Sequence, residues 1–145
     1  MLKVQLISEA IDLQKAFEIR KEVFVKEQNV SPEEEYDQFE DISRHFLALY
    51  GEDQIPCGTA RWRFTDKGIK LERFAILLSF RGLGLGAALV QACLDDIAQF
   101  PESVGKKIYM HAQVHAVGFY EKLGFQMEGE EFEEAGIRHF TMFKF

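Results

Sequence analysis

The stretch Arg81-Gly-Leu-Gly-Leu-Gly86 places three glycines at alternate positions between two patterned segments. The apolar-rich residues 70–77 before it are typical of a strand, and the apolar spacing over 85–100 predicts a helix after it. Backbone N–H groups at a helix start lack partners and lie at the positive end of the dipole. Glycines let a phosphate approach such a turn, and Arg81 can add a charge-assisted contact. The turn therefore predicts an anion site suited to a pyrophosphate, with a purely structural turn as the alternative.

Two other phosphate-binding motifs do not fit this turn. A P-loop requires Gly-Lys followed by Ser or Thr at the helix start, but Gly86 is followed by Ala87 and Ala88. A dinucleotide fingerprint requires Gly-x-Gly-x-x-Gly after an early strand, whereas this run lies in mid-chain after several strand-like segments. Nucleoside triphosphate hydrolysis and a Rossmann domain are therefore not expected.

The segments around the turn alternate between strand and helix patterns. The expected strands span residues 3–7, 45–50, 57–64, 70–77 and 108–114, with a closing hairpin over 125–132 and 137–143. The expected helices span about 13–27, 85–100 and 116–123, and Ser8 offers an N-cap to the first. This order predicts one α/β domain over residues 1–145, with a mixed, mostly antiparallel sheet and flanking helices.

Length and composition fit one such domain, because 145 residues with 47% apolar side chains can bury a sizeable core. A net charge of -7 disfavours nucleic acid as a partner, since phosphate backbones attract clustered Lys and Arg. No apolar run reaches the length that a membrane span needs, and Cys57 and Cys93 form no Cys-x-x-Cys motif. We therefore expect a cytoplasmic protein with reduced thiols and no membrane partner.

Two motifs resemble the cofactor signatures of GNAT acetyltransferases. Arg81-x-x-Gly84-x-Gly86 is similar to the family's Gln/Arg-x-x-Gly-x-Gly/Ala pattern, and Ala116-Val-Gly-Phe-Tyr-Glu-Lys-Leu-Gly-Phe125 resembles its second cofactor segment. Segments at 20–28, 71–73, 111–113 and 134–139 further resemble the ElaA-like subgroup. The resemblance implies a GNAT-like fold, splayed between strands four and five, and acetyl-CoA as acyl donor without a metal. Histidines 45, 111 and 139 also follow no metal-ligand spacing.

The resemblance also implies roles for individual residues. The expected cofactor-binding residues are Phe74, Ala75, Ile76, Arg81, Gly82, Leu83, Gly84, Leu85, Gly86, Ala87, His115 and Phe119. Tyr120 occupies the position of the acid that protonates the departing CoA thiolate, and a core tyrosine with its hydroxyl at the surface is the alternative. His115 replaces an asparagine that touches the pantetheine arm in many relatives, so a helix cap or an accessory base are alternatives for it.

Transfer to an amine also requires a base, because most amines are protonated at neutral pH. Strand alternation places Lys70, Glu72 and Phe74 on one face, and Leu71, Arg73 and Ala75 on the other. We predict Glu72 as general base or amine anchor, with an ion pair on the sheet as the alternative. The expected substrate-binding residues are Arg20, Gln28, Arg73, His111 and Gln113.

Six carboxylates crowd the segment 33–41, namely Glu33, Glu34, Glu35, Asp37, Glu40 and Asp41. The resemblance places this segment over the acceptor side of the cleft, which predicts a small cationic amine, and a solvated loop is the alternative. We therefore expect an N-acetyltransferase that acts on a primary amine by direct transfer, either alone or as a homodimer. A non-catalytic acyl-CoA-binding or protein-interaction module on the same fold is the competing interpretation.

Overall fold

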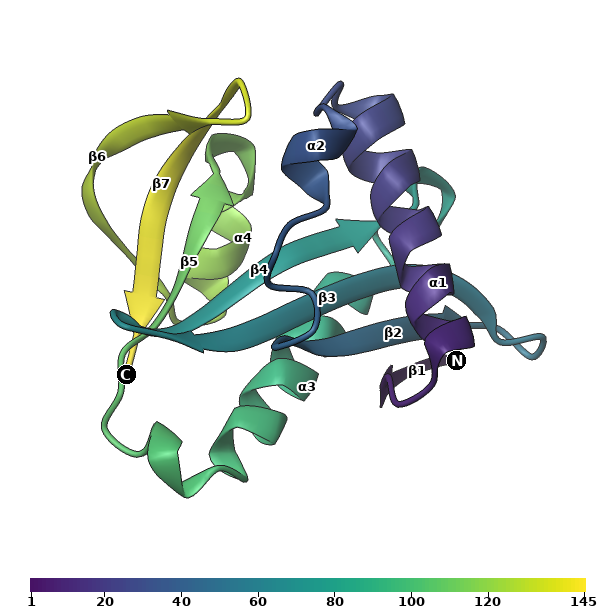
Figure 1. The fold of residues 1–145 in the computed structure, drawn as a ribbon, viewed down its shortest axis with the longest axis horizontal. Coiled ribbons are helices and arrows are strands. Elements are labelled where there is room, and N and C mark those ends of the chain that lie inside the picture. The colour runs from purple at the N-terminus through teal and green to yellow at the C-terminus, as the bar shows by residue number, and fades with distance from the viewer.

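A computed structural model describes residues 1–145 and places seven strands in one twisted sheet of order β1-β2-β3-β4-β5-β7-β6 (Figure 1). The strands are β1 (Leu2–Leu6), β2 (Arg44–Tyr50), β3 (Ile55–Thr65), β4 (Gly68–Ile76), β5 (Ile108–Gln113), β6 (Gln126–Glu134) and β7 (Ile137–Lys144). The helices are α1 (Ala10–Arg20), α2 (Pro32–Glu35), α3 (Leu85–Ala98) and α4 (Val117–Lys122), and a π-helical segment, Lys21–Glu27, continues α1. All neighbouring strands are antiparallel except β4 and β5, which confirms the predicted mixed, mostly antiparallel sheet.

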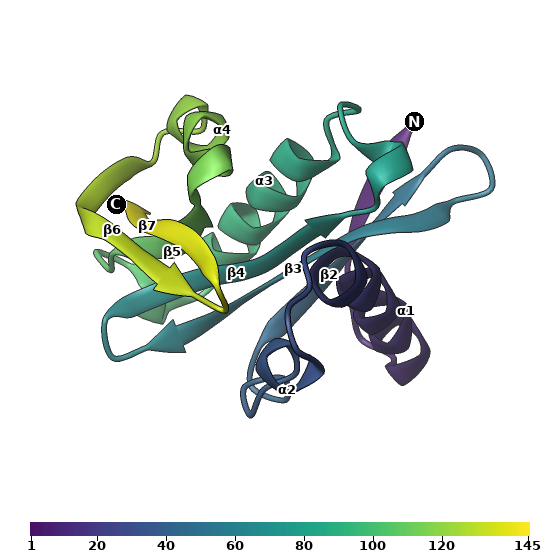
Figure 2. The same cartoon turned by 90° about the horizontal axis from the view of Figure 1, so that it is seen from above.

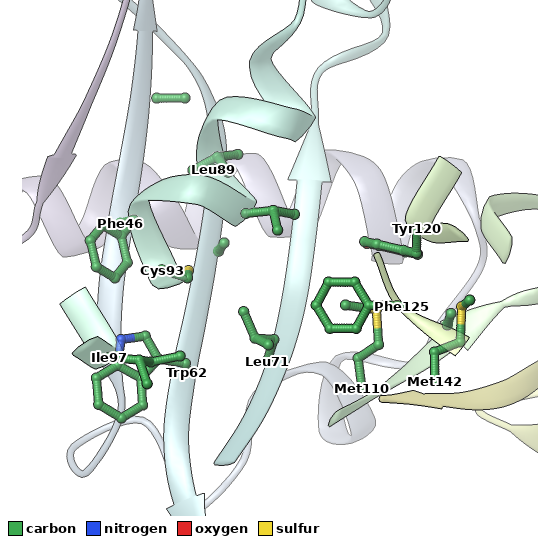
Figure 3. Packing of buried hydrophobic residues seen from close by; sticks show 14 of the residues in the cluster. Phe46, Trp62, Leu71, Leu89, Cys93, Ile97, Met110, Tyr120, Phe125 and Met142 are labelled. Atoms are coloured by element: carbon green, nitrogen blue, oxygen red, sulfur yellow. The ribbon is translucent and has the colours of Figure 1, made fainter. Parts of the chain in front are cut away.

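Helices cover both faces of the sheet, with α3 and α4 on one face and α1 and α2 on the other (Figure 2). The larger buried cluster lies beneath α3 and includes Trp62, Leu71 and Cys93 (Figure 3). The smaller cluster lies beneath α1 and joins Ala16 to Leu47. Strands β2 and β3 are buried on both faces, which is why their sequences are almost continuously apolar or small. None of the helices has both the length and the apolar character that crossing a membrane requires.

The sheet opens between β4 and β5. Only Ile69 pairs with Ile108 and Lys70 with Tyr109, and beyond these two pairs the parallel strands diverge. The β5-facing edge of β4 therefore has no ladder partner over its last residues, where backbone groups need other partners. The expected splay between strands four and five is confirmed.

A β-bulge interrupts β4 just inside this opening. Thr59 pairs with Ala75 and Arg61 with Glu72, so that Arg73 and Phe74 together face the single residue Ala60. Arg73 has a φ of +59°, in the left-handed region. The bulge changes the side-chain alternation, and the prediction that Glu72 and Phe74 share a face is wrong. Phe74 packs against the cluster under α3, whereas Glu72 hydrogen-bonds on the opposite face.

One prediction about a helix start is also corrected. Helix α1 begins at Ala10 with Glu9 at the cap position and no side-chain cap, so Ser8 is one residue too early. Pro32 occupies the first turn of α2, where its fixed φ and missing N–H are tolerated. The Ser31 hydroxyl caps α2 by accepting the Glu34 N–H at 3.3 Å. The acidic segment is thus anchored at its start.

Candidate functional site

A cleft of about 870 Å³ lies where β4 and β5 diverge. Gly82 and Phe119 line it on the side of α3 and α4. Asp37 and Glu134 line it on the other side, from the acidic segment and the β6–β7 hairpin. The cleft therefore joins the two faces of the sheet, and two substrates entering from opposite faces can meet inside it.

The predicted anion site lies at the start of α3, at one end of this cleft. Gly82 and Gly84 have φ values of +81° and +86°, which L side chains rarely adopt, and α3 begins directly after Gly84. A Cβ added to Gly82 would meet no atom within 4 Å, so open space lies in front of its backbone. Unpaired N–H groups at the start of a 14-residue helix, facing open space, fit a pyrophosphate.

Arg81 is already engaged in the structure. Its two terminal nitrogens donate to the Glu27 carboxylate, each at 2.7 Å, and its Nε donates to the Ile76 carbonyl at 2.9 Å. This side chain therefore ties the end of β4 to the π-helical segment. A direct contact of Arg81 with pyrophosphate stays a prediction, and the geometry favours a role in positioning the turn.

Tyr120 projects from α4 into the opening. Figure 3 shows the buried Tyr120 near Phe125. Its ring makes edge contacts with Phe74 and Phe125, both with centroids 6.2 Å away. Tyr36 and Tyr109 form hydrogen bonds through their hydroxyls, whereas Tyr120 forms none, and Tyr120 lines the cleft. Burial, with a smaller effect of nearby Cys93, raises the pKa of Tyr120, so the phenol keeps its proton at neutral pH. A neutral hydroxyl without a protein partner is a suitable proton donor.

Glu72 is surrounded by cations. Its carboxylate lies 2.6 Å from Arg61, 2.7 Å from Arg63 and 3.3 Å from Lys70. Burial opposes ionisation of Glu72, but Arg61 and the two other cations outweigh it and lower its pKa to about 2. A general base works best with a pKa near the operating pH, so these ion pairs favour the predicted alternative for Glu72, a structural ion pair, over the role of base.

The acidic segment is likewise paired with arginines. Arg20 bonds both Glu35 and Glu40, and Arg61 bonds Asp37 and Glu40 at 2.7 Å each. These two arginines are almost completely buried, at 1% and 0% side-chain exposure. Arg20 was predicted to bind substrate, but its donors are taken up inside the protein. Three of the six carboxylates of the acidic segment are therefore paired with buried arginines, and the preference for a cationic amine stays a prediction.

The remaining predicted acceptor residues do lie together in the cleft. The Gln28 and Gln113 side chains exchange two hydrogen bonds of 3.3 and 2.9 Å, which link the π-helical segment to the end of β5. His111, two residues earlier on β5, lies with its Nδ1 3.0 Å from the Glu134 carboxylate. The hydrogen bond from His111 is the main reason that the pKa of Glu134 is lowered, so this carboxylate is ionised and accepts. Nδ1 therefore carries the proton of this hydrogen bond, and Nε2 is the ring nitrogen that Glu134 does not engage.

His115 is exposed in the 3₁₀ turn before α4 and lines the cleft, but it caps no helix.

Two residues of the site were not indicated by sequence patterns. Glu134 was missed because its partner His111 lies 23 residues away. Arg61 was missed as well. Its pairing with Glu72 follows from the register of the β3–β4 hairpin, whose turn lies between Thr65 and Gly68.

Comparison with known proteins decides the family, since the model described as "Acetyltransferase (GNAT) domain" matches residues 7–144. The chain belongs to the GNAT acetyltransferase family. It is 41% identical to the uncharacterized N-acetyltransferase YjcF of Bacillus subtilis, over 99% of both chains. It superimposes on the crystal structure of Escherichia coli ElaA with a TM-score of 0.84, 26% identity and 99% coverage of both chains. An aminoglycoside 6'-N-acetyltransferase complexed with coenzyme A has the same fold, with a TM-score of 0.71, 15% identity and coverage of 98% and 96%.

Membership of the GNAT family supports acetyl transfer from acetyl-CoA. The resemblance to the ElaA-like subgroup is confirmed by these relatives. Neither the relatives nor the fold identifies the acceptor. The charges and hydrogen bonds of the cleft are therefore the observations from which an acceptor can be argued.

Proposed function

We propose that this protein transfers an acetyl group from acetyl-CoA directly to the primary amine of a small acceptor. The observation that carries the proposal is the splayed β4–β5 cleft, with the glycine turn at one end and the buried Tyr120 lining it. An anion site and a proton donor are thus arranged along one opening, as transfer from a CoA thioester requires.

Acetyl-CoA would enter from the side of α3 and α4. The backbone of the Gly82–Gly86 turn would hold the pyrophosphate, with Arg81 positioning that turn through Glu27 and Ile76. The unpaired edge of β4 from Phe74 to Ile76 offers backbone groups to the pantetheine arm. A solved CoA complex on the same fold supports this cofactor, although that protein is only 15% identical.

In the chemical step, the amine nitrogen attacks the thioester carbonyl carbon and a tetrahedral intermediate forms. The carbon–sulfur bond then breaks, and the Tyr120 hydroxyl gives its proton to the departing thiolate. His111 is the base in this proposal, because Glu134 orients its ring and its Nε2 can accept the amine proton. Glu72 is instead assigned to holding β3 and β4 through its ion pairs.

Direct transfer is favoured over an acetyl-cysteine intermediate. Cys57 and Cys93 are both completely buried, and burial raises the pKa of each thiol. A cysteine nucleophile needs its thiolate form and access to the substrate, and neither side chain has them.

Release of CoA thiol from acetyl-CoA over a panel of amines tests the proposal, together with calorimetric binding of acetyl-CoA. Amine-dependent release that falls sharply in Tyr120→Phe supports catalysis. Tight acetyl-CoA binding without release for any amine would instead favour the competing interpretation, a non-catalytic acyl-CoA-binding module.

A further inference from the structure

Arg73 is the least satisfied arginine of the acceptor side. Its Nη2 makes two long hydrogen bonds, 3.3 Å to the Glu34 carbonyl and 3.2 Å to Asp37. Its Nε is completely buried and forms no hydrogen bond, and it lies 3.7 Å from the Glu35 carboxylate. Arg61 in the same cluster makes four hydrogen bonds of 2.7 to 3.0 Å. Arg73 therefore has donor capacity that the protein itself does not use.

The backbone holds Arg73 at the cleft at a cost. A φ of +59° is uncommon for a residue with a side chain, and Asn or Gly would adopt it more easily. Strained residues of this kind concentrate at functional sites, because the surrounding structure must hold them in place. The bulge that produces the strain also places the partly exposed Arg73 side chain, at 24% exposure, among the residues lining the cleft.

The salt-bridge network that includes Arg73 has one more cation than it has carboxylates. Salt bridges join five cationic side chains, Arg20, Arg61, Arg63, Lys70 and Arg73, to four carboxylates, Glu35, Asp37, Glu40 and Glu72. Glu134, on the facing hairpin, is hydrogen-bonded to His111 instead. Burying a cation whose donors are not all hydrogen-bonded costs free energy, and a hydrogen bond to an anionic group of a ligand would reduce that cost.

We infer that the acceptor is a small molecule that carries a carboxylate as well as its primary amine, and that Arg73 binds this carboxylate. The inference rests on the proposed function and adds a substrate class to it. Arg73 and His111 come from opposite walls of the cleft, β4 and β5, so the two ends of such an acceptor have separate partners. The charged side chains that line the cleft include six carboxylates and four Lys or Arg side chains, so the inference rests on the unused donors of Arg73 and not on an excess of positive charge.

Matched pairs of acceptors test the inference, each pair an amino acid and its carboxamide, with CoA release measured at saturating acetyl-CoA. Rates are compared per concentration of neutral amine, because amidation itself lowers the pKa of the amine. We expect the wild-type protein to prefer the carboxylate by on the order of 10- to 100-fold in kcat/KM, as a charge-assisted hydrogen bond allows.

Arg73→Asn removes the guanidinium while tolerating the positive φ, and should bring the carboxylate-to-carboxamide ratio close to one. Arg73→Lys should retain part of the preference for the carboxylate. It replaces Arg73→Asn in the test if the Asn variant has a much lower melting temperature. Arg138→Gln is the matched control, since Arg138 is 66% exposed in an ion pair with Glu131 on the β6–β7 hairpin, and it should keep the full ratio.

The outcomes distinguish failure of the proposed function from failure of the carboxylate-bearing acceptor. No CoA release with any amine in the wild-type protein means that the proposed function has failed. Release that is equal for carboxylates and carboxamides, or faster for polyamines, leaves the proposed function intact and overturns the carboxylate-bearing acceptor. A preference that survives in Arg73→Asn overturns the assignment to Arg73.

Discussion

Replacing Glu72 with Gln tests whether this carboxylate holds the sheet together or acts in the chemistry. The substitution keeps the shape and removes the charge that Arg61, Arg63 and Lys70 face. A pKa lowered from 4.5 to about 2 corresponds to about 3 kcal/mol of stability at about 1.4 kcal/mol per unit. The side chain is only 10% exposed, so solvent screening reduces this figure little. We expect the free energy of unfolding at pH 7 to fall by about 3 kcal/mol.

The sign of the pH dependence follows from the direction of the shift. The folded pKa of Glu72 is depressed, so its stabilisation is complete above about pH 4.5 and is lost as the pH falls towards 2. Urea unfolding of wild type and Glu72→Gln should therefore differ most near neutral pH and converge in acid. Other carboxylates titrate in both proteins, and the difference between the two curves isolates Glu72.

Glu131→Gln serves as control, because Glu131 pairs with Arg138 at the exposed hairpin, and its loss should change stability by less than about 1 kcal/mol. The contrary result for Glu72→Gln is an unchanged unfolding curve combined with a kcat loss of about 10²-fold or more. That combination is what a general base would produce, and it would return Glu72 to the role first predicted.

Three further predictions concern the cofactor turn and the proton transfers. Leu83→Glu should weaken acetyl-CoA binding by about tenfold relative to Leu83→Gln in calorimetry, because Leu83 is 41% exposed in the turn and the added carboxylate repels phosphate. Tyr120→Phe should lower kcat by about 10²-fold while thermal stability is kept, since the hydroxyl has no hydrogen bond in the fold, and equal turnover would leave Tyr120 as a core residue. His111→Gln should lower kcat by a similar factor and Glu134→Gln by less, since Glu134 acts through His111; unchanged steady-state rates in both would exclude this pair as the base.

Much of the fold could be predicted because its signals are local. The turn at Gly82–Gly86 combines a strand end, a helix start and glycines in ten residues, and its conformation needs the positive φ that glycine supplies. The strands of the meander are separated by short turns, so their antiparallel pairing follows from chain length alone. The end of the first helix near residue 27 was predicted correctly, with the π-helical segment ending at Glu27, whereas its start lies at Ala10 and not near residue 13.

The acceptor side could be predicted only in part. Gln113 was predicted from its place at the end of β5 and His111 from the family resemblance, but the Glu134 partner comes from a hairpin whose position depends on the β5–β7 register. The sequence gives no sign of the bulge at Arg73, because its positive φ is adopted by an arginine and not by Gly or Asn. One inserted residue placed Glu72 and Phe74 on opposite faces, and Glu72 among the cations that favour a structural role for it.

The effect of the carboxylates in the acidic segment depends on the arginines that they pair with, and the sequence does not show these pairs. Arg20 and Arg61 are buried, and a buried guanidinium is tolerated only when carboxylates satisfy its donors. Glu35, Asp37 and Glu40 meet that need, so they are the counter-ions of α1 and β3 and not a solvated attractor for cations. Neutralising these three carboxylates would therefore destabilise the packing of the acidic segment against Arg20 and Arg61 before it changed the affinity for an acceptor. Removing one loosely held cation from the cleft wall, in contrast, changes the charge that an acceptor meets while the buried pairs stay in place.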